Sequence, residues 1–308
     1  HDVSAVVEKG TNLVVNRAVY NTVASEALST QILLGKQLFY DARDNRLSRE
    51  DYISCASCHN DGGHDGRIWD MTGFGEGLRN TIDLRGRGGM AHGPLHWSAN
   101  FDEVQDFEGQ IRNLAEGTGL ITGNPHPPLG TANAGRSPDL DALAGYVSSL
   151  GATLDSPYRE ANGDLTPQAA LGREVFRTQD CAACHAGSSF TDSATNNVHD
   201  IGTISASSGG RLGGSLTGID TPTLRGLWNG APFLHDGTAS NIAEAVTAHI
   251  DVSVSGVEMD QLVAYLQQID GFEAAAPSNS APSLSNPGNQ TNDENAAVTL
   301  ALTARDPN

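Results

Sequence analysis

Two short motifs in the chain combine thiols and an imidazole at a spacing that suits a porphyrin. The pattern Cys-x-x-Cys-His occurs at residues 55–59 and again at residues 181–185. Residues three apart share one face of a helical turn, so the two thiols of a motif can bond to the two vinyl groups of one porphyrin. The adjacent histidine can bind the iron, and each motif therefore predicts a covalent c-type haem. The predicted attachment residues are Cys55, Cys58, His59, Cys181, Cys184 and His185.

Structural zinc is the alternative that paired cysteines allow. The four cysteines of the two motifs are all the cysteines of the chain, so no thiol is left for a disulfide. Zinc would require the two pairs to meet in one small domain, whereas these motifs are far apart in the sequence and each ends in histidine. Two covalent haems are therefore favoured over zinc or a redox dithiol.

The composition predicts a loop-rich protein of two domains whose core is partly haem. The chain has 308 residues, of which 38% are hydrophobic and 35 are glycine. It has no apolar run long enough for a transmembrane helix. A net charge of −19 argues against a nucleic-acid partner and is typical of a soluble surface. Covalent haem attachment implies export, so we expect a periplasmic or extracellular protein whose signal peptide has been removed.

The spacing of apolar residues predicts a mainly α fold. It indicates helices over about 24–39 and 101–114 and a closing helix over about 258–269. The Ser-Pro pair at 137–138 and the Thr-Pro pair at 166–167 are typical of an N-cap followed by a first-turn proline. Each pair is therefore expected to open a helix.

The landmarks of the first half recur in the second half in the same order. Leu-Gly-x-x-x-Phe at residues 34–39 recurs at 171–176, and Asp-x-Leu-x-x-Tyr at residues 141–146 recurs at 260–265. Each half thus has an opening helix, a haem motif, a long loop region and a closing helix. We predict two tandem cytochrome c domains at about 23–154 and 155–274, preceded by an N-terminal extension at 1–22.

The C-terminal part, residues 275–308, differs in composition. Its first residues are rich in Ala, Pro, Ser and Asn and are typical of a linker. The alternation at 297–303 predicts a short β segment. This part resembles the opening of Ig-like modules of bacterial surface proteins, which suggests the front of a larger polypeptide. The alternative is a tail strand that packs on the haem domains.

Four further motifs carry a resemblance to a known family. They are residues 34–41 (LGKQLFYD), 77–81 (GLRNT), 221–225 (TPTLR) and 231–237 (APFLHDG). Over roughly 31–270 the chain resembles the bacterial di-haem cytochrome c peroxidases and their relative MauG. The resemblance implies two cytochrome c domains packed face to face. It also implies that one haem meets peroxide while the other supplies electrons.

The resemblance assigns catalytic roles to four residues. Trp97 corresponds to the tryptophan between the haems, and Glu116 to the distal acid that assists cleavage of the peroxide O–O bond. Asp106 stands where the family usually has glutamine. His235 corresponds to a histidine near the haem pair. The alternatives are a core aromatic for Trp97, a solvated face for the two acids and a structural role for His235.

The resemblance also implies a calcium site between the domains. Asn80, with the backbone oxygens of Gly230 and Pro232, matches this site, and oxygen ligands suit a hard cation.

The sixth ligand of the first haem is left open by the sequence. The family's usual distal histidine is replaced here by Phe74, which cannot ligate iron, so an open or water-ligated iron is expected. Other residues of the same region could instead fill the site. They are His64, His92 and His96 and, as weaker candidates, Met71 and Met90.

The sixth ligand of the second haem is predicted to be His249. It follows His235 at the interval that the resemblance gives for this ligand, where the peroxidases have methionine and MauG has tyrosine. Met259 is the second choice, and a polar residue after an amphipathic helix is the alternative for His249. Histidine in place of methionine lowers the reduction potential of haem iron.

Together these features predict a di-haem redox enzyme of the peroxidase or MauG type. Peroxide would react at the first haem, with electrons passed through the second, and the partners would be hydrogen peroxide and an electron-donor or substrate protein. The main alternative is a non-catalytic di-haem electron carrier of a secreted or surface protein. A haem-based binding module is a third.

Overall fold

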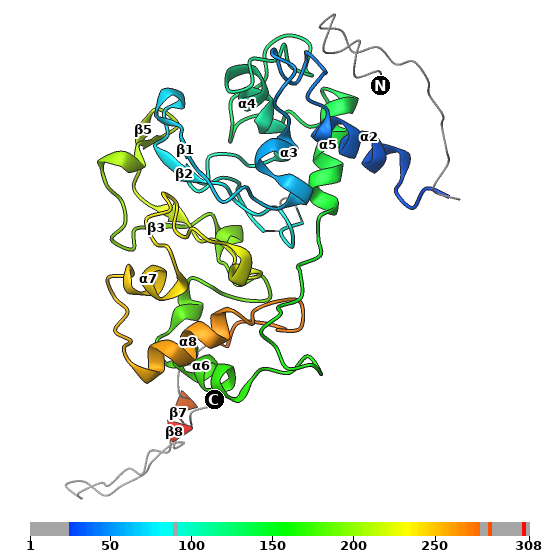
Figure 1. The fold of residues 1–308 in the computed structure, drawn as a ribbon. Helices are drawn as coiled ribbons and strands as arrows, with labels where there is room; N and C mark the ends of the chain where they lie inside the picture. Colours follow the sequence, from blue (N-terminus) through cyan, green and yellow to red (C-terminus); the bar gives the residue numbers. More distant parts are fainter. Residues whose placement is uncertain (1–24, 89–91, 278–282, 285–303, 306–308) are drawn as a thin grey trace, which may run out of the picture.

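The computed structural model holds two helix pairs, and long loops and short strands make up most of the rest of the molecule (Figure 1). The structure describes residues 25–88, 92–277, 283–284 and 304–305. The expected N-terminal extension and the strand at 297–303 lie outside these residues, as does most of the C-terminal module. A helix-rich fold with a few short strands is therefore confirmed, and the division into two tandem cytochrome c domains stays a prediction.

Within residues 25–88 and 92–154, the first half holds four α-helices and one small antiparallel sheet. The helices are α2 (Thr30–Tyr40), α3 (Cys55–Cys58), α4 (Glu108–Asn113) and α5 (Pro138–Ser149), and the strands are β1 (Ile68–Asp70) and β2 (Leu78–Asn80). Trp69 pairs with Arg79 in the β1–β2 register. The expected helix at 101–114 is in fact a 3-10 turn, Val104–Phe107, that continues into the shorter α4.

The second half also has an opening helix, a haem motif and a closing helix, and it holds three α-helices. They are α6 (Pro167–Thr178), α7 (Ile242–Thr247) and α8 (Val257–Leu266). Its strands pair antiparallel as β3 (Val198–His199) with β6 (Ile219–Asp220) and β4 (Gly210–Arg211) with β5 (Gly214–Ser215). A last pair joins β7 (Ser283–Leu284) to β8 (Ala304–Arg305). No helix in the described part of the chain combines the length and apolar character needed to cross a bilayer.

The helices begin where the sequence predicts N-caps. The Ser137 hydroxyl accepts a hydrogen bond from the Leu140 amide, and Thr166 accepts one from Ala169. Both helices continue with proline, whose missing N–H would be unpaired at that position anyway. Ser29 caps α2 in the same way, so this helix begins later than the expected residue 24.

Each half has its own buried cluster on its helix pair. In the first half, Phe39 of α2 meets Tyr146 of α5 edge to face, with ring centroids 5.2 Å apart. In the second half, Phe176 of α6 meets Tyr265 of α8 in the same way at 5.5 Å. The α2–α5 and α6–α8 pairs lie apart, with β1, β2 and β3 and long loops between them (Figure 1). The repeated landmarks of the sequence are therefore the contacts that close each cluster.

A glycine allows the two helices of each pair to touch at their backbones. A Cβ atom added at Gly35 would lie 1.9 Å from the carbonyl oxygen of Ala142, and one added at Gly172 would lie 1.8 Å from that of Gln261. Neither carbonyl can move without disturbing its helix. Glycine is therefore required at both crossings, and the haem motif follows each crossing in the chain.

We predict that Gly172→Ala destabilises the protein by about 1–3 kcal/mol, because the added methyl group forces α6 away from α8. The matched control is Gly145→Ala in α5, where an added Cβ meets nothing within 4 Å. That change should be neutral or stabilise by up to ~1 kcal/mol, since alanine favours a helix more than glycine does. Denaturant unfolding followed by circular dichroism measures both variants. Equal stability of the two would contradict the proposed backbone contact.

Candidate haem sites

The first motif lies on a single helical turn that directs its three side chains toward one cavity. Cys55 and Cys58 begin and end α3, and the His59 amide donates to the Cys55 carbonyl at 2.9 Å. The His59 Nδ1 lies 3.1 Å from the Gly63 carbonyl oxygen. A backbone partner at Nδ1 sets the tautomer that leaves Nε2 free for a metal.

The cavity beside this turn has a volume of about 310 Å³ and fits a haem in its chemistry. Cys55, Cys58 and His59 all line it, and both thiols are free of disulfides. Its walls are largely apolar, as a porphyrin requires. Among the apolar lining residues are Leu38, Phe39, Leu47, Trp69, Phe107 and Ile111.

Burial sets the protonation of the motif residues. It raises the pKa of Cys55 and of Cys58 to about 11, which keeps both thiols neutral at ordinary pH. It lowers the pKa of His59, which keeps the imidazole neutral and able to bind a metal. The free motif therefore holds its three groups uncharged within an apolar site.

The second motif has the same arrangement on a 3-10 turn, Cys181–Ala183. The His185 Nδ1 lies 3.3 Å from the Phe190 carbonyl oxygen. Burial, followed by the charge of the neighbouring His249, lowers the pKa of His185 to about 4. The His249 Nδ1 in turn meets the Ala245 carbonyl of α7 at 2.9 Å. The structure thus brings the two imidazoles near each other, each with Nδ1 held by backbone, while Met259 lies in the first turn of α8.

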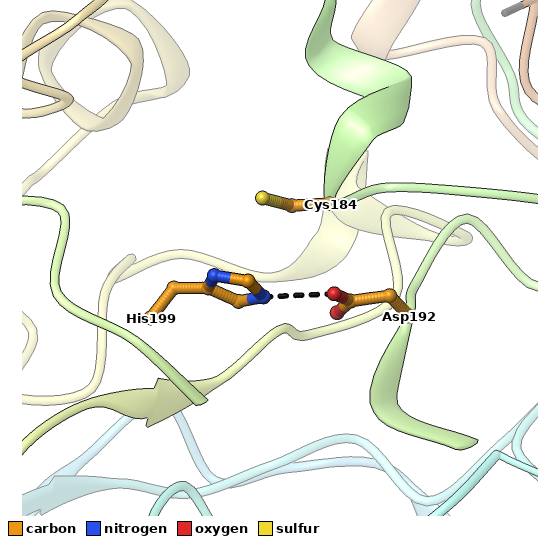
Figure 2. Close-up of side chains that lie close together, drawn as sticks. All are labelled: Cys184, Asp192 and His199. Atoms are coloured by element: carbon orange, nitrogen blue, oxygen red, sulfur yellow. Dashed lines mark hydrogen bonds and ion pairs between the residues drawn. The ribbon is translucent and has the colours of Figure 1, made fainter. Parts of the chain in front are cut away.

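Cys184 also belongs to a cluster with Asp192 and His199 (Figure 2). Their ligand atoms all lie within 4.8 Å of one another, and the His199 Nε2 is 2.7 Å from Asp192 Oδ2. This donor set could hold a metal only through a free Cys184 thiolate. Attachment of haem converts that sulfur to a thioether, so the cluster is part of the second haem site.

Trp97 lies where the first cavity meets the second half of the chain. Its ring lines the cavity, and its Nε1 donates to the Asn80 carbonyl at 2.8 Å. Its own carbonyl accepts a hydrogen bond from the Asp220 amide, also at 2.8 Å. Asp220 follows the second haem motif in sequence and lines the first cavity. This position supports the predicted place of Trp97 between the haems.

The other three predicted catalytic residues lie away from the first cavity. The Glu116 side chain is 51% exposed and pairs with Arg49, because the backbone turns outward there at a φ of 54°. Asp106 is buried, but it accepts hydrogen bonds from Asn133 Nδ2 and the Asp102 amide. His235 is buried against the Ser208 hydroxyl at 2.8 Å. None of the three is among the described residues that line the cavity, so their predicted roles at the first haem lack support in this geometry.

Glu76 and Gln110 are among the polar lining residues of the cavity that the sequence did not single out. Glu76 is buried, and its carboxylate accepts from Arg79 Nε at 2.9 Å and Asn100 Nδ2 at 2.8 Å. The Oε1 of Gln110 is buried with no hydrogen-bond partner among the described residues. Gln110 shares a helical face with Phe107, which was a signal in the sequence. Glu76 stands in a glycine-rich loop that gives no such signal.

The candidate calcium residues lie together at the end of β2. Asn80 Nδ2 donates to the Pro232 carbonyl at 2.5 Å, and its Oδ1 is buried without a partner among the described residues. Gly230 is two residues from Pro232 in the same loop. Exchanging the nitrogen and oxygen of the Asn80 amide would direct its Oδ1 and the Pro232 carbonyl oxygen toward one point. The predicted calcium site stays a prediction.

A family profile described as Di-haem cytochrome c peroxidase matches residues 29–153. Cytochrome c peroxidase Ccp of Escherichia coli is 27% identical over 288 residues, covering 78% of this chain and 58% of that protein. Cytochrome c551 peroxidase of Pseudomonas aeruginosa is 25% identical, covering 77% of this chain and 78% of that one. The methylamine utilization protein MauG of Methylorubrum extorquens is 28% identical, covering 71% and 68%. The chain thus spans little more than half of the E. coli protein.

Solved structures show the same fold. A hydrazine synthase structure from Kuenenia stuttgartiensis matches with a TM-score of 0.57 at 21% identity, covering 84% of this chain and 98% of that chain. A MauG-like protein associated with microbial copper homeostasis matches with a TM-score of 0.55 at 18% identity, covering 81% and 91%.

We predict that the intact protein, denatured and weighed by mass spectrometry, exceeds its polypeptide mass by two haems. The double variants Cys55→Ala/Cys58→Ala and Cys181→Ala/Cys184→Ala should each keep one haem, because each motif holds its own porphyrin. A pyridine haemochrome assay checks the count independently. A mass equal to the bare chain, with zinc bound in its place, would overturn the assignment of both motifs.

We predict that Asp220→Asn changes how stability depends on pH. Burial raises the pKa of Asp220 from 3.8 to about 7, while the Ser193 hydroxyl at 2.8 Å opposes the shift. The folded protein therefore binds more protons than the unfolded chain between about pH 4 and 7, and its stability falls as pH rises through that window. The melting temperature of Asp220→Asn should exceed that of wild type by more at pH 8 than at pH 5. An equal change at both pH values, or the same pattern in the exposed control Asp251→Asn, would contradict this.

Proposed function

We propose that this chain is a member of the di-haem cytochrome c peroxidase and MauG family and a redox enzyme that reacts with peroxide at its first haem. The observation that carries this proposal is the cavity beside Cys55, Cys58 and His59. It adjoins both thiols and the imidazole, and it extends to the tryptophan that meets the second half. The two halves, about 23–154 and 155–274, would each hold one covalent haem.

Bound haem would supply the iron that exchanges electrons with peroxide. The chain's own residues would place that iron and control access to it. His59 would hold the iron from the side of α3, with its ring oriented by the Gly63 carbonyl. The apolar walls would exclude water, which strengthens the electrostatic effect of the few polar groups present. Of these, Gln110 has an unpaired oxygen and could bind a proton donor.

The second haem would act as the electron relay, with His185 and His249 as its two ligands. Support comes from the neighbouring positions of the two imidazoles and from the backbone partner that each has at Nδ1. Two imidazoles favour a lower potential than an imidazole–methionine pair. This haem would therefore be suited to stabilising an oxidised partner haem. Trp97 would lie on the path between the two.

The remaining parts of the proposal concern the surroundings of the enzyme. Its partners would be hydrogen peroxide and a protein that either donates electrons or is oxidised. We place it in the periplasm or outside the cell, where covalent haem is attached after export. Asn80, Gly230 and Pro232 would hold calcium at the junction of the halves.

One observation favours the electron carrier as a second candidate. His96 also lines the first cavity, and a second imidazole on that iron would make both haems six-coordinate. A carrier of this kind would bind neither peroxide nor carbon monoxide. The two functions therefore differ in whether the first iron becomes accessible.

We predict that His249→Ala converts one haem to the high-spin state and leaves the other unchanged. The lost imidazole leaves the His185-bound iron with one axial ligand, and its reduction potential should change. Optical and electron paramagnetic resonance spectra of the ferric protein measure the spin states, and stopped-flow mixing with hydrogen peroxide measures the reaction. The matched control is His126→Ala, a part-buried histidine that is bonded to the Ala132 carbonyl and does not line the first cavity. Unchanged low-spin signals in the His249 variant would remove this residue from the second haem. No reaction of the wild type with peroxide would refute the proposed function.

A further inference from the structure

The histidines of the described residues differ in which ring nitrogen has a hydrogen-bond partner. In His59, His185 and His249 the Nδ1 has a backbone carbonyl as its partner. His96 likewise has a partner at Nδ1, the Oε1 of Glu76 at 3.2 Å. An anchored Nδ1 and a free Nε2 are the features of a histidine that binds a metal. His126 also has a bonded Nδ1, through the Ala132 carbonyl, but it is not among the residues that line the first cavity, whereas His96 is.

His96 is held in one orientation on the wall of the first cavity. Its ring lies 4.4 Å from that of Phe101 and 4.9 Å, edge to face, from that of Phe107. Its backbone has a φ of 69°, which is costly for a residue with a side chain and is kept only where the surroundings impose it. Burial lowers the pKa of His59, and the charge of His96 lowers it further, so the two rings are near each other.

Glu76 is a fixed, ionised partner for this ring. Its side chain is 9% exposed and is bonded to Arg79 and Asn100 as well as to His96. Burial alone would raise its pKa, but the hydrogen bond and charge of His96, followed by the charge of Arg79, lower it. A carboxylate that accepts from Nδ1 keeps the proton there, leaves the Nε2 lone pair free and makes the imidazole more basic.

The other histidines of this region are engaged at Nε2. His64 bonds through Nε2 to the Asn229 carbonyl at 2.5 Å and through Nδ1 to the Gly66 amide. The His92 Nε2 lies 3.1 Å from an Arg87 guanidinium nitrogen, which donates to it. Phe74, at the usual ligand position, has no donor atom. Of the three histidines that could fill the first site, His96 alone has the anchored Nδ1 and the free Nε2.

We propose that His96 is the sixth ligand of the first haem iron in the resting ferric protein, with Glu76 as the residue that positions it. The inference rests on the haem assignment of the proposed function but not on its peroxide chemistry. It replaces the open iron expected from Phe74. Peroxide can then reach the iron only in the fraction of molecules in which His96 has left it.

The test starts from the spin states of the ferric protein. Wild type should show two low-spin haems, His96→Ala one low-spin and one high-spin haem, and His96→Ala/His249→Ala two high-spin haems. Added imidazole should restore a low-spin signal in His96→Ala, which shows that the variant is folded around an empty ligand position. The control His126→Ala should match wild type. A high-spin haem in wild type, or a His96→Ala spectrum equal to that of wild type, would overturn the proposal.

Two further readouts distinguish ligation from a merely structural role. Glu76→Gln should keep the low-spin signal and raise the reduction potential of the first haem, because the imidazole becomes less basic. In His96→Ala the rate constant for peroxide should rise at least ~10-fold, since a ligand bound in nine of ten molecules lowers apparent reactivity by that factor. A slower reaction with unchanged spin states would assign His96 to proton transfer and refute ligation. If peroxide reacts with neither wild type nor His96→Ala while the spin states change as expected, the proposed peroxide reaction is refuted and the assignment of His96 as ligand stands.

Discussion

The backbone contact between an opening and a closing helix is the constraint on which each half depends. At Gly35 and Gly172 the helices approach more closely than any side chain allows, and the aromatic pairs Phe39–Tyr146 and Phe176–Tyr265 pack directly after these contacts. A loop connects the end of each opening helix to the Cys-x-x-Cys-His turn that follows it. The helix crossing thus determines where the thiols and the imidazole stand. The apolar walls of the first cavity come from the same pair of helices and from the loop that follows.

The part of the site between the helix pairs depends on polar contacts instead. Trp97 and Asn80 bond to each other and to residues of the second half, through the Asp220 amide and the His235 carbonyl. Arg79 donates to the Ser208 carbonyl, and Arg211 donates back to the carbonyl of Ser98. These bonds are buried or partly buried, and each would leave a costly unpaired group if broken. The irregular middle of the molecule is therefore held by specific hydrogen bonds rather than by a continuous apolar core.

The sequence predicted the features that depend on local chemistry. The haem motifs follow from spacing, the starts of α5 and α6 from Ser137 and Thr166, and the recurring helix pairs from repeated apolar positions. The loops were less predictable, because Glu76 and His96 are twenty residues apart and no periodicity connects them. Glu116 was assigned its role by the family resemblance, which does not reveal that the backbone turns this side chain to the surface. Asp106 faces Asn133, a partner in a distant loop that spacing alone does not reveal.

The buried thiols of the first motif have a consequence for how the protein is made. A neighbouring pair of cysteines in an oxidising compartment readily forms a disulfide, which would block attachment of the porphyrin. The attacking species is the thiolate, and a pKa of about 11 leaves only about 10⁻⁴ of each thiol in that form at pH 7. Burial of these sulfurs therefore opposes a disulfide between them, because it favours the thiol over the thiolate.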